Sequence, residues 1–112
     1  MLLVCHFLLT PDEVEEFTAR AVTALGLLGS QPGCRGVEVG RAVDEEGRWV
    51  LTARFDSVNA YRRSLSPFDV REHVAPLLAR CLSESPGVVP TTFETLLSCD
   101  GGTVRSHPTL LA

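Results

Sequence analysis

The sequence predicts an α+β domain whose elements follow the order β-α-β-β-α-β. Three observations carry this prediction: short apolar or alternating runs that are typical of strands, two regions with helical spacing, and turns rich in Gly or Pro between them. The chain has 112 residues, the size of a single domain. Its 45% hydrophobic and 21% charged residues indicate a globular rather than a disordered protein.

The first strand is expected over residues 2–9, a nearly continuous apolar run that suits a central strand buried on both faces. A helix follows, with Thr10 as its N-cap, Pro11 as its first residue and Glu13 as the partner in a capping box. Gly29 is the expected end of this helix. Apolar residues recur at helical spacing along one of its faces, at Val14, Phe17, Ala21, Leu25 and Leu28.

A β-hairpin is expected over residues 34–43 and 48–55. A two-residue loop between Asp44 and Gly47 would place residue 43 opposite residue 48. One face of the hairpin then carries Trp49, Leu51, Ala53 and Phe55 beside Gly36, Glu38, Gly40 and Ala42. The other face, which would meet a second sheet, a partner subunit or solvent, carries Val37, Val39, Arg41, Val43, Arg48, Val50, Thr52 and Arg54. A one-residue bulge would exchange part of this assignment.

A short helix capped by Asp56 or Ser57 is expected next, followed by a longer helix that runs to about Leu82 and is kinked or restarted at Pro76. A final strand is expected over residues 88–97. This order is that of the ferredoxin-like split βαβ arrangement, a four-stranded antiparallel sheet with both helices on one face. We expect a domain over residues 1–98 and a C-terminal tail over residues 99–112. Because the uncovered face of the sheet is apolar, the simplest way to cover it is a homodimer in which two sheets meet.

Composition and motifs exclude several classes of protein. The formal charge of −4 argues against a nucleic-acid surface, which needs a basic patch. The four cysteines form no C-x-x-C pair, so no metal site is expected. The apolar start has no basic flank and is too short to span a membrane, which predicts a cytoplasmic protein with reduced thiols. No phosphate-binding loop, G-x-S-x-G or H-E-x-x-H motif is present.

Three segments carry a resemblance to a known family: PGC at 32–34, GRWVLTARFDSVNAYRRSL at 47–65, and SPF at 66–68 followed by APLLA at 75–79. In this order they resemble the antibiotic biosynthesis monooxygenase (ABM) domains, which are dimeric α+β barrels. The resemblance implies a homodimer with a pocket in each subunit, and a tail that crosses to the partner. It also implies a cofactor-independent oxygenase that converts aromatic, polyketide-type phenols into quinones. Of the residues that haem-degrading relatives use, this sequence matches only one, at His73, so haem degradation is the less favoured function.

Two histidines are the candidate catalytic residues. His6, in the first strand, could act as a base toward a phenol, although a core histidine bonded to the backbone is the commoner case. His73, beside the apolar stripe of the long helix, could face the pocket or be a half-exposed helix residue, which is again commoner.

Trp49, Phe55 and Tyr61 are candidate substrate-binding residues because aromatic rings stack on flat ligands, and packing in the core is the alternative for each. Arg54 could hold a carboxylate or an enolate, or form a structural ion pair. Two hypotheses therefore remain. One is an oxygenase with a ligand-sized pocket into which a histidine points. The other is a non-catalytic ligand-binding or accessory homodimer whose interior is filled by its own side chains.

Overall fold

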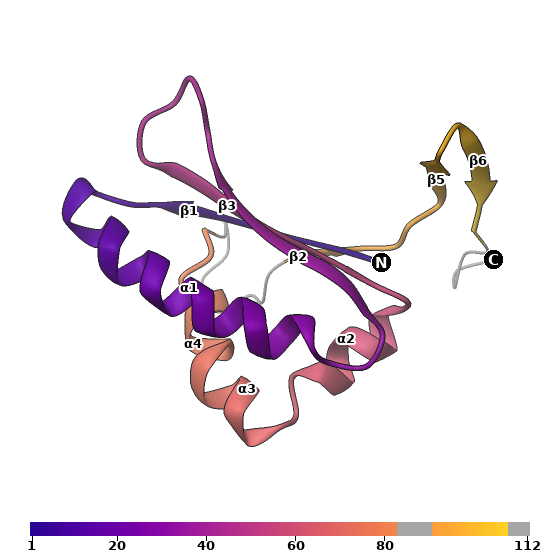
Figure 1. Cartoon of the computed structure of the whole chain (residues 1–112), viewed down its shortest axis with the longest axis horizontal. Coiled ribbons are helices and arrows are strands. Elements are labelled where there is room, and N and C mark those ends of the chain that lie inside the picture. Colours follow the sequence, from indigo (N-terminus) through magenta and orange to yellow (C-terminus); the bar gives the residue numbers. More distant parts are fainter. Residues whose placement is uncertain (83–90, 108–112) are drawn as a thin grey trace.

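The computed structural model describes residues 1–82 and 91–107. Its elements are β1 (Leu2–Leu8), the 3-10 helix η1 (Pro11–Glu13), α1 (Val14–Gly29), β2 (Cys34–Arg41), β3 (Arg48–Phe55), α2 (Val58–Ser64), α3 (Phe68–His73), α4 (Ala75–Leu78), β4 (Thr91–Phe93), β5 (Leu97–Asp100) and β6 (Thr103–Ser106). The first four strands form one sheet in the order β2-β3-β1-β4, with all neighbours antiparallel. Figure 1 shows the four labelled α-helices on one side of this sheet. The predicted α+β class and the ferredoxin-like arrangement are confirmed.

Strand β1 lies at the centre of the sheet, between β3 and β4. Its side chains alternate, because successive residues of a strand point to opposite faces. Leu3, Cys5 and Phe7 point toward the helices and are fully buried. The opposite face of β1 carries Leu2, Val4, His6 and Leu8, which are partly or largely exposed. The predicted central position is therefore correct, whereas the predicted burial holds for one face only.

The first helical segment begins at the predicted cap, but its first turn is the 3-10 helix η1 and α1 itself starts at Val14. The Thr10 N–H donates to the carboxylate of Glu13 over 3.0 Å, and both halves of the capping box are present. Pro11 opens the 3-10 turn that precedes the helix, and the helix ends at Gly29. Its buried face consists of Phe17, Ala21, Ala24 and Leu28, which pack on the sheet.

The register of the β2–β3 hairpin differs from the prediction by one residue. Arg41 pairs with Trp49, and the Ala42 N–H donates to the carbonyl of Arg48 over 2.9 Å, so residues 43–47 form the loop. This longer loop turns at Gly47, whose φ of +83° suits glycine and whose added Cβ would lie 2.9 Å from the carbonyl oxygen of Leu9. The predicted faces of β2 are therefore wrong. Val37, Val39 and Arg41 share the helix side with Ala53, Leu51 and Trp49, whereas Gly36, Glu38 and Gly40 lie on the open side with Arg54, Thr52 and Val50.

The second helical region is split as expected. Ser57 caps α2 by accepting a hydrogen bond from the Ala60 N–H over 3.0 Å. Helix α3 ends at His73 and α4 starts at Ala75, because Pro76 lacks the N–H that a continuous helix would need. No helix in residues 1–82 and 91–107 is long and apolar enough to cross a membrane.

The C-terminal segment contains a hairpin that is not expected from the sequence. Strands β5 and β6 pair antiparallel around Gly101 and Gly102, whose φ values are +57° and +84°. In Figure 1 this hairpin stands apart from the main sheet, and its Leu97 and Val104 side chains are exposed. The expected final strand is confirmed only at Thr91–Phe93, and its first part, 88–90, lies outside the described residues, as does the end of the tail, 108–112.

Candidate functional site

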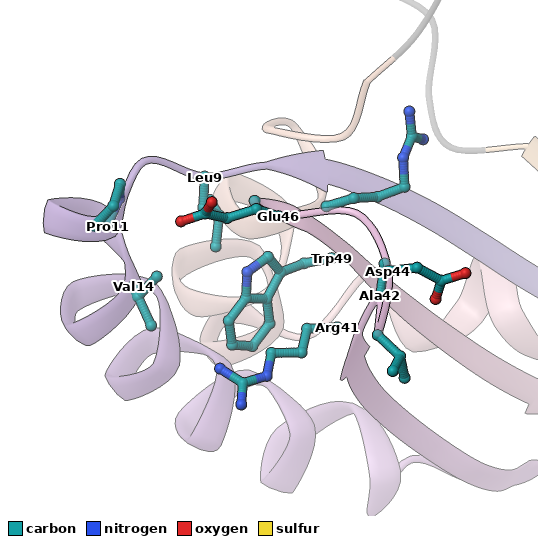
Figure 2. Close-up of a pocket in the computed structure, with 11 residues that line it drawn as sticks. Leu9, Pro11, Val14, Arg41, Ala42, Asp44, Glu46 and Trp49 are labelled. Atoms are coloured by element: carbon teal, nitrogen blue, oxygen red, sulfur yellow. The ribbon is translucent and has the colours of Figure 1, made fainter.

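A groove of about 770 Å³ lies between the β2–β3 loop and the corner where β1 leads into α1. We call it the Trp49 groove. Its walls consist of Leu9, Pro11, Val14, Arg41, Ala42, Val43, Asp44, Glu46, Gly47, Arg48 and Trp49 (Figure 2). The Leu9 N–H donates to the carbonyl of Gly47 over 2.8 Å, which ties the loop to the end of β1. A backbone hydrogen bond thus helps to fix the shape of the groove.

Trp49 provides the aromatic surface of the groove. It lies near the start of β3, on the helix side of the sheet, and its indole contacts the Phe17 ring edge-on with centroids 5.9 Å apart. The Phe17 ring in turn packs on Phe7, with centroids 4.9 Å apart. Because this stack is anchored in the core, the indole keeps one orientation while remaining partly exposed. Val14 and Pro11 add apolar surface beside it. A planar aromatic ligand could therefore stack on a fixed ring.

Two arginines line the groove and differ in their partners. The Arg48 Nε donates to the Glu45 carboxylate over 2.8 Å. Arg41 forms no ion pair with any described residue, and Figure 2 shows its side chain beside the indole of Trp49. The shorter loop expected from the sequence would place Arg41 on the opposite face of the hairpin. The groove thus combines an aromatic ring with a guanidinium that forms no ion pair within the described residues.

Both candidate catalytic histidines lie outside the Trp49 groove. His6 is exposed on the open face of β1, opposite Val50 of β3. His73 is half-exposed at the end of α3, with its Nε2 atom 3.8 Å from the Glu72 carboxylate. The structure does not bring either residue next to Trp49.

The other candidate ligand contacts are also separate from the groove. The rings of Phe55 and Tyr61 pack edge-on with centroids 5.4 Å apart, and both side chains are buried in the core. Arg54 is exposed on the open face of the sheet, near Gly36. Of the predicted site residues, the structure places only Trp49 in the groove.

Burial makes Tyr61 an unusual tyrosine. Loss of solvation, together with the nearby thiols of Cys5 and Cys81, raises the pKa of Tyr61 from 10.0 to about 12. Tyr61 is the only tyrosine in the chain, so tyrosinate absorbance reports on it alone. We expect a titration midpoint near pH 12 in the folded protein and near 10 in urea. Because the folded pKa is the higher one, Tyr61 contributes to the free energy of unfolding through its protonated hydroxyl. This contribution is complete below pH 10 and is lost as the pH rises through 12. A midpoint near 10 in both states would show that the hydroxyl is exposed.

A second hollow of about 530 Å³ lies at the other end of the hairpin, where β3 leads into α2. Its lining is Gln31, Pro32, Gly33, Asp56, Ser57, Ala60, Arg63 and Ser64. It contains no aromatic residue, and Asp56 is already paired with Arg35. Across the residues that the structure describes, no group of three or more His, Cys, Asp or Glu side chains is arranged to hold a metal ion. The Trp49 groove is therefore the better candidate for a ligand site.

Comparison with protein families identifies the class. The antibiotic biosynthesis monooxygenase model matches residues 1–76, which cover β1 to the start of α4. This chain belongs to the antibiotic biosynthesis monooxygenase (ABM) family, as the resemblance of its sequence predicts. A search of curated proteins found no match.

Solved structures agree on the fold. A putative antibiotic biosynthesis monooxygenase from Chloroflexus aurantiacus is 26% identical with a TM-score of 0.57, over 84% of this chain and 95% of that one. SnoaB, a cofactor-independent oxygenase from Streptomyces nogalater, is 21% identical with a TM-score of 0.60, over 80% and 82% of the two chains. A conserved protein from Methanosarcina mazei is 17% identical with a TM-score of 0.63, over 75% and 82%. These likenesses show the fold. The family match over residues 1–76 supports a general monooxygenase-like class.

Proposed function

We propose that this protein is a cofactor-independent monooxygenase that binds a planar aromatic, polyketide-type phenol in the Trp49 groove. The observation that carries the proposal is the partly exposed indole of Trp49 at a groove of about 770 Å³ in a member of the ABM family. Cavities of this size accommodate small organic ligands. The likeness to SnoaB, itself a cofactor-independent oxygenase, supports the same reaction class.

The reaction balances without an added reductant. A base removes a proton from an anthrone-like phenol, and the resulting anion donates electrons to dioxygen. One oxygen atom enters the ring carbon, whose CH₂ group becomes the quinone carbonyl, and the other oxygen leaves as water with the two hydrogens of that CH₂. The protein has to promote deprotonation, orient the ring and keep bulk water from the anion. In the groove, Trp49 provides the surface that orients the ring.

Three side chains are candidates for the base. Glu46 lines the groove and would be the base if the substrate is confined there. His6 acts if the substrate site extends to the open face of the sheet, where a second subunit would cover it. His73 acts if the site extends along the outer surface of α3. Single replacements His6→Ala, His73→Ala and Glu46→Gln separate these alternatives, because among the three only the one that removes the base is expected to lower turnover while the fold survives.

The proposal predicts oxygen uptake when the protein is mixed with a panel of anthrone-like phenols. Trp49→Ala should lower kcat/KM about tenfold, because an aromatic contact of this kind contributes about 1.4 kcal/mol. Trp49→Phe, which keeps an aromatic ring, is the matched control and should retain most of the activity. An oxygen electrode and quinone absorbance measure the two sides of the reaction. No uptake with any phenol, or uptake that is insensitive to Trp49→Ala, would contradict the proposal.

A second candidate function is non-catalytic binding. The space between the sheet and the helices is filled by the protein's own side chains, and both candidate histidines lie outside the groove. A protein of this kind would bind the aromatic ligand at Trp49 without consuming oxygen. Quenching of Trp49 fluorescence in the absence of oxygen uptake would favour this function over the oxygenase.

We also propose a homodimer in which the open faces of two sheets meet, as in a dimeric α+β barrel. This face exposes apolar side chains on two strands, among them Leu2, Leu8 and Phe93, and a patch of that kind marks an interaction site. The C-terminal tail from residue 99, which includes most of the exposed β5–β6 hairpin, would then contact the partner. We place the dimer in the cytoplasm because Cys5, Cys34, Cys81 and Cys99 are free thiols.

A further inference from the structure

We propose that Arg41 binds an anionic substituent of the aromatic ligand, so that the Trp49 groove selects aromatic carboxylates over neutral aromatics of the same size. This inference rests on the proposed aromatic site. It adds a specificity-determining residue and a narrower class of ligand.

The register of the hairpin places Arg41 and Trp49 together. They are paired residues of neighbouring antiparallel strands, and paired residues point to the same face of a sheet. Both lie on the helix side and both line the groove. Figure 2 shows the Arg41 side chain extending along the indole toward α1. A ring stacked on Trp49 would therefore have a guanidinium at its edge.

The charge of Arg41 is available to a ligand. Arg48, the other arginine of the groove, is occupied by Glu45. Arg41 has no such partner within residues 1–82 and 91–107. An unpaired guanidinium that faces a groove can bind an anion without first breaking an internal ion pair.

The two carboxylates of the groove do not cancel this preference. In Figure 2 the Asp44 carboxylate points away from Trp49, and Glu46 lies on the opposite side of the indole from Arg41. A ligand with one anionic substituent can therefore direct it toward Arg41 and keep its apolar part near Leu9 and Val14.

Guanidinium chemistry specifies the class of ligand. The planar fork of arginine donates two parallel hydrogen bonds to a carboxylate. An aryl carboxylate is coplanar with its ring, so one ligand could stack on Trp49 and meet Arg41 edge-on. A charge-assisted pair of this kind changes affinity roughly tenfold to a hundredfold.

The test compares 2-naphthoate with 2-naphthol at pH 7, by calorimetry and by quenching of Trp49, the only tryptophan in the chain. We expect the wild-type protein to bind naphthoate at least tenfold more tightly. Arg41→Met keeps much of the aliphatic stem and should abolish this preference without changing the affinity for naphthol. Arg41→Lys keeps the charge but loses the fork, and should retain part of the preference. Arg71→Met, at an exposed position of α3, makes the same change in net charge and should change neither affinity.

The outcomes separate this inference from the proposed function. If wild-type protein binds naphthol but Arg41→Met leaves naphthoate affinity within twofold, or weakens both ligands equally, the role of Arg41 is disproved and the aromatic site stands. If neither ligand binds the wild-type protein, the aromatic site fails, and the role of Arg41 fails with it. Equal loss in Arg41→Met and Arg71→Met would assign the effect to net charge and disprove a local contact.

Discussion

Truncating Phe17 to alanine is expected to lower the free energy of unfolding by about 3–5 kcal/mol. The side chain is fully buried, and its ring contacts Phe7 and Trp49. The Arg80 guanidinium carbon lies 5.4 Å from the ring centroid. Alanine would leave a cavity between α1 and the sheet that neighbouring helices cannot readily fill. Urea denaturation, followed by far-UV circular dichroism, measures the loss.

The same substitution should also release the indole of Trp49, because Phe17 is its support from the core. We therefore expect a red-shifted and broadened Trp49 emission even under conditions in which the variant stays folded. Val22→Ala is the matched control on the same helix, since Val22 is 70% exposed and its truncation should stay within about 0.5 kcal/mol. A Phe17→Ala protein with wild-type stability would show that this side chain is not part of the core.

Replacing Val50 by glutamate is expected to convert the proposed dimer into a monomer. Val50 lies on the open face of β3, opposite His6 of the central strand, and is only partly exposed. In the separate chain, a glutamate there can reach water. Between two packed sheets it would be a buried carboxylate beside His6, and the loss of its hydration, which costs several kcal/mol, is expected to weaken association at least a hundredfold. Size-exclusion chromatography with light scattering at micromolar concentration measures the change.

Val22→Glu introduces the same charge on the outer surface of α1 and should leave the dimer intact. A wild-type protein that elutes as a monomer would contradict the dimer itself. A Val50→Glu protein that remains a dimer would instead place the interface on another surface.

Local signals in the sequence were sufficient to predict most of the fold. The capping box of Thr10 and Glu13 marked the start of η1, which leads into α1, and Pro76 marked the break between α3 and α4, because each acts through its own backbone neighbours. The C-terminal hairpin was missed although Asp100, Gly101 and Gly102 form a turn sequence that favours hairpins. The flanking strands have only four residues each, which is too short for an alternating pattern to mark them.

The site was less predictable because it depends on contacts between distant segments. Arg41 joins Trp49 only in the register that the longer loop permits, and a shift of one residue moves a side chain to the other face. The continuous apolar run of β1 hid its alternation, so the sequence could not show that His6 faces away from the helices. The position of Trp49 on the helix side of β3 was predictable, because β3 alternates regularly.

The central position of β1 also affects how the chain reaches its fold. Leu2–Val4 pair with Phe93 to Thr91, from the other end of the domain, as well as with β3. Such non-local pairings slow folding, because a long loop has to close before the contacts contribute. During synthesis, the hydrogen-bonding edge of β1 would stay unpaired until β4 emerges from the ribosome. Nascent chains are therefore expected to be most prone to strand-to-strand association in that interval, and a chaperone that shields the first strand should improve the yield of folded protein.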